Sequence, residues 1–388
     1  MNLLTLAKAQ YEQILADRRF LHQYPELSKQ EEQTAQFIQK RLNELGFVVE
    51  EKIAGTGLVG RYDTGKPGKS FLLRFDMDAL PIQEENNFPY RSKNDGVMHA
   101  CGHDGHMAIG LAIARIISEH ADEFSGIYHL LFQPAEEIGY GAKAMVEEGV
   151  LDRIKPDAVL GAHLWNEKPF GWLAIKPGPL MAGSGRFEII VKGKGGHGGR
   201  PQLAIDPIVA SAQLITQLQT LISRNISPLE SAVISVCSVE SGSAYNIIPS
   251  QARLQGTIRY FDAMVYKQIR KRMTEICAGV GLATACEISI DLEGLASATI
   301  NDSVLAQNMQ TAAGRLEQRL EVDASYQTML SEDVGVFFKF VPGCFVLVGA
   351  GESPDGNQYG HHHPKFDFDE RAMPLAAALL LQTCLELG

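Results

Sequence analysis

Long hydrophobic runs are lacking in this chain. None of its apolar stretches approaches the ~20 residues that a membrane-spanning helix needs. The first residues, "MNLLTLAKAQYEQILADRRFLHQ", mix charged side chains with leucines at helical spacing, so we predict one amphipathic helix there and no signal peptide. The sequence thus predicts a cytoplasmic protein that has no membrane partner.

Positive charge is also scarce relative to negative charge. The 388 residues include 35 Lys and Arg against 46 Asp and Glu, a net charge of −11. This balance argues against nucleic acid as a partner, because a phosphate backbone attracts basic proteins. A chain of this length with 45% hydrophobic residues is able to bury two cores, so we expect two domains.

Closely spaced cysteine pairs are missing as well. The six cysteines are scattered and none forms a C-x-x-C redox motif. Five of them lie in apolar or helical runs, where a small buried side chain is expected. Cys101 differs, because it lies in "HACGHDGH" (99–106) among three histidines. Repeats and low-complexity tracts are also absent from the sequence.

The order of apolar segments predicts an α/β fold at both ends of the chain. Short buried strands alternate with helical segments, as in a sheet covered by helices. We predict strands at 69–75, 126–132, 157–162 and 341–351, and helices at 105–119, 140–149 and 369–386. The two ends would then form one domain.

The middle of the chain has a different order of elements. We predict strands at 186–193, 231–240, 251–261 and 285–294, and helices at 206–222 and 263–279, with Asp206 as the N-cap of the first helix. The order β-α-β-β-α-β is typical of a ferredoxin-like module. We therefore expect a module at 184–295 inserted into a catalytic domain made of 1–183 and 296–388.

Polar side chains follow four of the predicted strands. They are Asp76 with Asp78, Glu136 with Glu137, His163, and the triplet His361 to His363. Ligands of open α/β sheets bind beyond the carboxyl ends of the strands, and thiolate, imidazole and carboxylate groups bind zinc-like ions. Ligands collected from such distant segments suit an active site better than a structural zinc site.

Each of these groups has an ordinary structural interpretation when taken alone. His163 could be a hydrogen-bonded core residue, the glutamates a solvated turn, the aspartates acceptors for nearby backbone groups and the histidine triplet a surface loop. His106 is more typical of a structural residue, and His99 is undecided. The joint occurrence of the groups favours the metal site.

The candidate ligands exceed what one catalytic metal needs. Two metals that share a bridging ligand use the set better than one four-coordinate ion with an open position. If "QPAEE" is extended, its adjacent glutamates point to opposite sides, so that one holds metal and the other is free as a general base. The implied reaction is metal-assisted hydrolysis of a carbonyl compound.

Seven segments carry a family resemblance that spans nearly the whole chain in the same order. The chain resembles the amidohydrolase branch of the aminoacylase and carboxypeptidase metallopeptidase family, which includes hippurate hydrolase, N-acyl-L-amino acid amidohydrolase, N-acetyldiaminopimelate deacetylase and auxin-conjugate hydrolases. The segments are "RFDMDALPIQE", "HACGHDGHMA", "QPAEE", "GAHLW", "KGKGGHGGRP", "YNIIPSQARLQGTIR" and "HHHPKFDFDE". The resemblance implies that a metal-bound hydroxide cleaves the amide bond of N-acyl amino acids or similar small amides.

The resemblance also implies residue roles in the catalytic domain. Glu136 is the expected general base, and Asp78 supports the metal site. Two divalent ions per subunit (Zn, Mn, Ni or Co) are implied, with Cys101 as the bridging ligand. The implied metal ligands are Cys101, His103, Glu137, His163 and His362.

For the inserted module, the resemblance implies a lid that also forms a homodimer. His197 is implied to stabilise the oxyanion, within one subunit or across the dimer, and Asn246 and Arg259 to bind the substrate carboxylate. From the residues alone, His197 could be incidental in a Gly-rich turn and Arg259 an ordinary polar strand residue. Two departures from the family pattern, "GGRPQ" after His197 and Val334 in "SEDVG", leave the substrate open.

Two further functions stay open. A dipeptidase or carboxypeptidase needs the same metals and water. A catalytically inactive protein that binds small carboxylates would keep the fold, but the complete ligand set with Glu136 argues against it.

Overall fold

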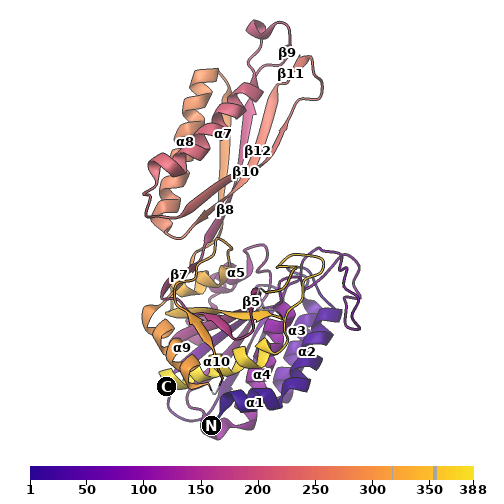
Figure 1. Ribbon diagram of the computed structural model, residues 1–388, viewed down its shortest axis with the longest axis vertical. Helices are drawn as coiled ribbons and strands as arrows, with labels where there is room; N and C mark the ends of the chain where they lie inside the picture. Colours follow the sequence, from indigo (N-terminus) through magenta and orange to yellow (C-terminus); the bar gives the residue numbers. More distant parts are fainter. Residues whose placement is uncertain (317, 353–355) are drawn as a thin grey trace. The chain divides into compact units, whose positions relative to one another are not determined.

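The computed structural model describes residues 1–316, 318–352 and 356–388 (Figure 1). Contacts between residues divide the chain into two compact units. Unit 1 consists of Met1–Leu180, Thr299–Gln327 and Asp333–Gly388, and unit 2 of Met181–Ala298 and Thr328–Glu332. Within the described residues, no helix is both long and apolar enough to cross a membrane.

Unit 1 is built on an eight-stranded mixed sheet with the order β1-β2-β4-β3-β5-β16-β6-β15. This sheet, covered by helices, confirms the predicted α/β class. Its strands are β1 (Val48–Ile53), β2 (Gly57–Asp63), β3 (Ser70–Asp76), β4 (Ile127–Gln133), β5 (Ala158–Pro169), β6 (Trp172–Ala174), β15 (Glu321–Asp323) and β16 (Gly343–Gly351). A separate pair joins β7 (Gly178–Met181) to β14 (Thr299–Asn301).

Helices α4, α9 and α10 pack against the sheet of unit 1, and α1 and α2 pack onto α4 and α10. Helix α4 is buried along almost its whole length, because it is apolar on all sides beyond its first turn. The α-helices of unit 1 are α1 (Leu3–Ala9), α2 (Tyr11–Gln23), α3 (Glu32–Glu44), α4 (His103–Glu119), α5 (Gly141–Glu147), α6 (Val150–Ile154), α9 (Ser303–Arg315) and α10 (Ala372–Leu387). Short 3₁₀ turns lie at η1 (Ala121–Glu123) and η3 (Asp333–Lys339).

Four central strands of unit 1 run parallel to one another. β3 pairs in parallel with β4 and β5, and β5 with β16. Their carboxyl ends therefore meet at one edge of the sheet, as the strand-end argument requires. Strand β5 is longer than predicted, and His163 lies within it opposite Leu347, not beyond its end. The pairing with β16 continues to Pro169 and keeps this segment extended.

The predictions of a single N-terminal helix and of a buried Cys237 are wrong. The N-terminal segment forms two helices, because the first helix ends before Gln10. The backbone N–H of Gln10 bonds to the carbonyls of Ala7 and Lys8. The side chain of Gln10 bonds instead to Glu119 and Arg115. Cys237 is exposed, because the register of its strand shifts around it and leaves it as the extra residue of a bulge, whereas the other four cysteines predicted to be buried are buried.

Unit 2 has the element order β8-α7-β10-β12-α8-β13, as the sequence predicts. Its four-stranded antiparallel sheet has the order β10-β12-β8-β13, which is that of a split βαβ module. Apolar side chains of both helices form its core with one face of the sheet. The elements are β8 (Gly183–Lys192), α7 (Pro207–Asn225), β10 (Ala232–Ser241), β12 (Gln251–Tyr260), α8 (Ala263–Thr284) and β13 (Glu287–Ala296).

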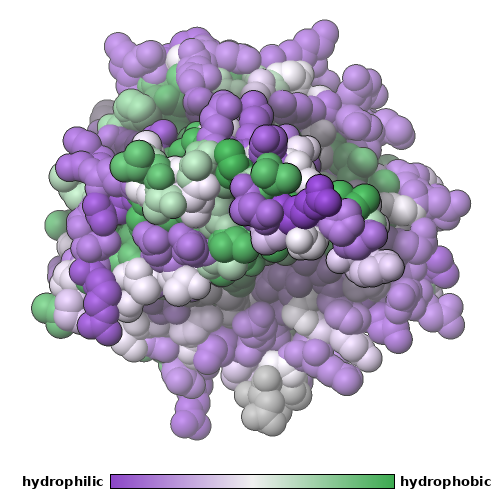
Figure 2. All heavy atoms as spheres, turned by 90° about the horizontal axis from the view of Figure 1, so that it is seen from above, coloured by the Kyte–Doolittle hydropathy of each residue, from purple (hydrophilic) through white to green (hydrophobic). Residues whose placement is uncertain are grey.

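Unit 2 also contains a helix cap and a small hairpin. Asp206 caps α7, since its side chain accepts from the backbone N–H groups of Ile208 and Val209. A small hairpin joins β9 (Gly196–His197) to β11 (Ile247–Ile248), and the 3₁₀ turn η2 (Pro201–Leu203) follows β9. In the view of Figure 2, hydrophilic side chains predominate and hydrophobic ones lie in small groups between them.

Candidate metal and catalytic site

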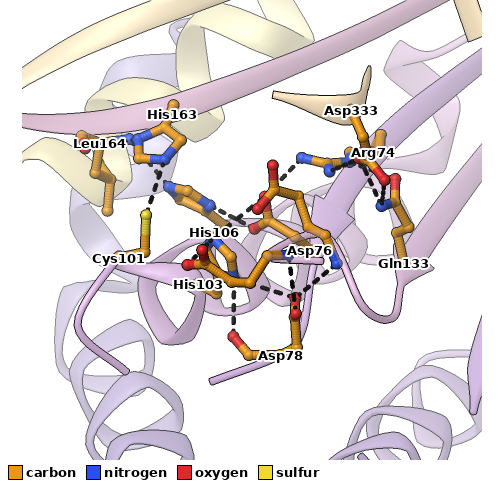
Figure 3. Close-up of polar contacts among 12 residues, drawn as sticks. Arg74, Asp76, Asp78, Cys101, His103, His106, Gln133, His163, Leu164 and Asp333 are labelled. Carbon is orange, nitrogen blue, oxygen red and sulfur yellow. Dashed lines mark hydrogen bonds and ion pairs between the residues drawn. The ribbon is translucent and has the colours of Figure 1, made fainter. Parts of the chain in front are cut away.

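The carboxyl end of β3 is held by a buried ion-pair network. Arg74 donates to Asp76 at 2.6 Å, and the other carboxylate oxygen of Asp76 bonds to His106 Nδ1 at 2.6 Å. His106 Nε2 accepts from the backbone N–H of Leu164 at 3.0 Å. Both ring nitrogens of His106 are therefore occupied within the protein, which agrees with its structural interpretation (Figure 3).

Cys101 and His103 lie at the N-terminus of α4, on either side of Gly102. Gly102 has φ +86°, a left-handed conformation that favours glycine. His103 Nδ1 donates to the backbone oxygen of Asp78 at 2.8 Å, so Nε2 is the nitrogen that could bind a metal ion in place of a proton. Among the described residues Nε2 has no hydrogen-bond partner, and the nearest carboxylate oxygens belong to Asp76 at 3.7 Å and Glu137 at 3.9 Å.

The charge around His103 favours a cation. Burial by itself lowers the pKa of this imidazole, but the carboxylates of Asp76, Asp78 and Glu137 outweigh burial and raise it to about 10. Glu137 Oε1 is buried and, within the described part of the chain, also lacks a hydrogen-bond partner. A ring nitrogen and a carboxylate oxygen that face each other beyond hydrogen-bond distance fit a metal ion between them.

His163 is oriented as a ligand from β5. Its Nδ1 donates to the Leu164 carbonyl at 2.9 Å, and its Nε2 lies 3.6 Å from Cys101 Sγ. Burial, together with His106 and His361, lowers the pKa of His163 well below its usual value. The ring is therefore neutral, as a metal-binding histidine must be.

Glu136 and Glu137 lie in a turn and not in an extended segment. Ala135 has φ +52° and begins the turn after β4. Asp78 accepts from the backbone N–H of Glu136 at 3.0 Å and of Glu137 at 3.1 Å, while Ser28 donates to Asp78 at 2.6 Å. The prediction that the two carboxylates point to opposite sides is wrong, because an oxygen of each lies within 4.8 Å of a ring nitrogen of His103.

The histidine triplet divides by position. His362 adopts φ +65°, donates its backbone N–H to Ala100 at 2.8 Å and brings Nε2 to 3.3 Å from Glu137 Oε2. A left-handed histidine is uncommon, and here it directs the ring to the site. His361 turns instead to the Leu164 carbonyl oxygen at 3.0 Å.

Among the groups of potential ligand atoms in the described residues, three consist only of the predicted ligands and Glu136, and in each of them all atoms lie within 4.8 Å of one another. Cys101 belongs to two of them, so the donor set suits two ions that share a thiolate. Figure 3 shows Cys101, His103 and His163 converging from the start of α4 and from β5. The groups are Cys101 with His103 and His163, Cys101 with Glu137 and His362, and His103 with Glu136 and Glu137.

The expected site residues of unit 2 lie in two places within it. His197 pairs with Ile247 in the β9–β11 hairpin, and the backbone oxygen of Asn246 accepts from Gly198 at 2.9 Å. Arg259 lies near the far end of β12, roughly 25 Å along the strand from its first residue. Its guanidinium bonds to Thr257 Oγ1 at 2.6 Å, and burial lowers its pKa.

Several residues of the network were not found from the sequence. Asp333 accepts from Arg74 and Gln133 and from the backbone of Ala142. Glu31 accepts from the backbone of Ala135. The sequence around these residues does not indicate a role in the site, since Glu31 lies at a helix start and Asp333 in a turn. His99 is buried, and burial chiefly lowers its pKa to about 4.

This chain is similar to known proteins over most of its length. N-acetyl-L-cysteine deacetylase of Bacillus subtilis is 38% identical over 387 residues, covering 100% of this chain and 90% of that protein. N-acyl-L-amino acid amidohydrolase of Geobacillus stearothermophilus is 45% identical over 268 residues, covering 69% and 72%. A dinuclear metal-binding peptidase from Bacillus subtilis superimposes with a TM-score of 0.84 at 33% identity, over 97% of this chain and 98% of its own. The model of peptidase family M20/M25/M40 matches residues 72–386, and the chain belongs to this family of hydrolases.

Proposed function

We propose that this hydrolase removes the acyl group from N-acyl amino acids with the help of two divalent ions. The observation that carries the proposal is the pair of ligand groups that share Cys101, with Glu136 beside them. The proposed metal ligands are Cys101, His103, Glu137, His163 and His362. Zn, Mn, Ni and Co all suit a set that mixes thiolate, imidazole and carboxylate.

When bound, two such ions would polarise the amide carbonyl as Lewis acids and lower the pKa of the attacking water. Glu136 accepts the proton of that water and delivers it to the leaving nitrogen, as a general base and then a general acid. Asp78 holds the peptide N–H groups of Glu136 and Glu137, so the base and the neighbouring ligand are fixed together. The carbonyls that bond to Nδ1 of His103 and His163 keep both Nε2 atoms available as ligands.

The substrate class rests on the relatives. A deacetylase of N-acetyl-L-cysteine and an amidohydrolase of N-acyl-L-amino acids are both similar over most of this chain. The acid part of such a substrate needs a cationic partner, and we propose Arg259 with Asn246 for this role. His197 is the proposed oxyanion donor.

For the arrangement of the chain, we propose a lid and dimerisation domain at 184–295 within a catalytic domain of 1–183 and 296–388. The homodimer and the cytoplasmic location stay predictions. Size-exclusion chromatography with light scattering would measure the dimer, and a monomer at micromolar concentration would contradict it.

The test combines metal content with turnover. Protein loaded separately with each of the four metals should bind two ions per chain and hydrolyse members of an N-acyl-amino-acid panel. Glu136→Gln keeps the side-chain shape and removes the base, so kcat should fall about 10²–10⁴-fold while metal content stays at two. Glu147→Gln, on the exposed face of α5, is the matched control.

Two results would count against the proposal. Wild-type kcat in the Glu136→Gln variant would exclude the assigned base. Faster turnover of free dipeptides than of their N-acetyl counterparts would replace the substrate class with that of a dipeptidase.

A further inference from the structure

Glu31 is a buried glutamate outside the proposed ligand set. It directly precedes α3, and none of its side chain is exposed. One carboxylate oxygen accepts from the backbone N–H of Ala135 at 2.9 Å, and the other accepts from the hydroxyl of Thr56 at 2.6 Å. Its two acceptors therefore join a surface segment next to β2 to the turn that carries Glu136 and Glu137.

Two buried carboxylates together hold three consecutive backbone N–H groups. Glu31 takes that of Ala135, and Asp78 takes those of Glu136 and Glu137. The carbonyls of the turn are occupied by its own later residues, since the N–H groups of Tyr140 and Gly141 bond to Ala135 and that of Gly139 to Glu136.

Ala135 is the residue that most needs such support. Its φ of +52° is unfavourable for a residue with a Cβ, and the residue is fully buried. Without Glu31, its N–H would be buried without an acceptor in this conformation, which favours a change of the turn. A carboxylate is well suited to the task because hydrogen bonds to a charged acceptor are stronger than neutral ones.

We propose that Glu31 is a positioning residue for catalysis: through the Ala135 peptide it sets the direction of Glu136 and Glu137. The inference rests on the proposed function, since the direction of these side chains affects catalysis only if Glu136 is the general base and Glu137 a metal ligand. Glu31 itself belongs to none of the groups of potential metal ligands among the described residues.

The experiment compares two substitutions of Glu31. Glu31→Ala removes both hydrogen bonds, so kcat should fall about 10–100-fold, with KM changed much less. Glu31→Gln keeps an oxygen for Ala135 N–H, and the Thr56 hydroxyl can reverse and accept from the new amide, so most of kcat should return. Glu32→Ala, at the exposed next position of α3, is the control and should behave as wild type.

Hydrogen exchange at single-residue resolution provides a reading that needs no substrate. In Glu31→Ala, exchange should speed up at Ala135, Glu136 and Glu137 while α4 and the core strands stay protected. Competition with a chelator should show weaker metal binding in the same variant, because Glu137 moves with the turn.

The outcomes separate this proposal from the proposed function. Wild-type kcat and exchange in Glu31→Ala would overturn it, as would equal losses in the Ala and Gln variants or faster exchange spread evenly over unit 1. If the wild-type protein hydrolysed no N-acyl amino acid, the proposed function would fail, while exchange and metal affinity would still decide whether Glu31 holds the turn.

Discussion

The two units of this chain treat charge in opposite ways. Unit 1 buries arginines, histidines and carboxylates throughout, whereas Glu332 is the one charged side chain that the described part of unit 2 buries. The whole net charge of −11 also falls to unit 1, since unit 2 has nearly equal numbers of basic and acidic residues. The difference shows that fixed polar geometry is concentrated in unit 1.

Fixed polar geometry has a desolvation cost, which the partners of each buried charge must offset. A buried charge is tolerated when it is paired and hydrogen-bonded, and the pairs then hold one another in place. Asp76, Asp78 and Glu31 act in this way around the candidate ligands of unit 1. His197 in unit 2 is exposed, with its ring bonded only to the nearby Gly199 N–H among the described contacts.

Removal of one buried charge of unit 1 should have the largest effect on stability. Arg18 is fully buried and donates to Asp104 at 2.8 Å, Asp367 at 2.8 Å and Glu370 at 3.0 Å. Arg18→Met keeps much of the volume but removes the permanent cation beside Asp104, which then keeps, among the described side chains, only its bond to His22 at 2.8 Å, so the free energy of unfolding should fall by about 3–5 kcal/mol. Denaturant unfolding of the full chain would measure this.

The neighbouring arginine is the control for that substitution. Arg19 pairs with Glu370 but its side chain is 42% exposed, so Arg19→Met should cost only about 0–1 kcal/mol. Hydrogen exchange should locate the effect of Arg18→Met in unit 1. Equal losses in the two variants, or equal loss of protection in both units, would contradict the comparison.

Acid should destabilise unit 1 more than unit 2, with a somewhat smaller effect on the free energy of unfolding. Burial, and then Arg61, lowers the pKa of His129 to about 4, against about 6.5 in an unfolded chain. Because the folded pKa is depressed, the unfolded state binds the proton first, so stability present above pH 6.5 is lost as pH falls towards 4. The loss is at most about 3 kcal/mol, from the linkage of about 1.4 kcal/mol per pKa unit.

The measurement uses metal-free protein, so that release of metal in acid does not contribute, and the difference between wild type and variant cancels the titration of the other histidines. Stability curves of wild type and His129→Phe should converge or cross between pH 6.5 and 4, with the variant losing less. Unit 2 contains a single histidine, the exposed His197, and its exchange protection should change little over the same range. Parallel curves for the two proteins would refute the role of His129.

The sequence predicted those features that depend on local pattern. Apolar segments followed by polar residues identified Asp78, Glu136 and Glu137, because strands that run parallel deliver their ends to one edge. Alternation of apolar and polar residues likewise predicted the element order of unit 2, where one face of the sheet is covered and the other is not.

What the sequence could not predict depends on contacts between distant segments. The bond from Ala135 to Glu31 joins residues 104 positions apart, and nothing near Glu31 in the sequence distinguishes it from Glu32. The sequence does not predict the turn at Glu136, because a left-handed alanine has no sequence signature. The length of β5 was underestimated for a related reason, since pairing with β16 decides it.

The smallest expected effect lies in unit 2 and concerns its backbone. Ala285 follows α8 with φ +56° and is exposed, so its strain has no evident function. Ala285→Gly should raise the free energy of unfolding by about 0.5–1 kcal/mol, because glycine adopts this conformation without the Cβ penalty. The gain is smaller than the penalty itself, since glycine has more conformational entropy than alanine in the unfolded chain. Slower hydrogen exchange at the end of α8 would report it.

The matched control is the same substitution two residues earlier, at Ala283. Ala283 is exposed within the last turn of the same helix, so Ala283→Gly should lower stability, by up to about 1 kcal/mol. The two substitutions have opposite expected signs, although they remove the same methyl group in neighbouring positions. If both lowered stability, the left-handed cap would not be a source of strain, and the difference between Ala285 in unit 2 and the supported Ala135 in unit 1 would lose its meaning.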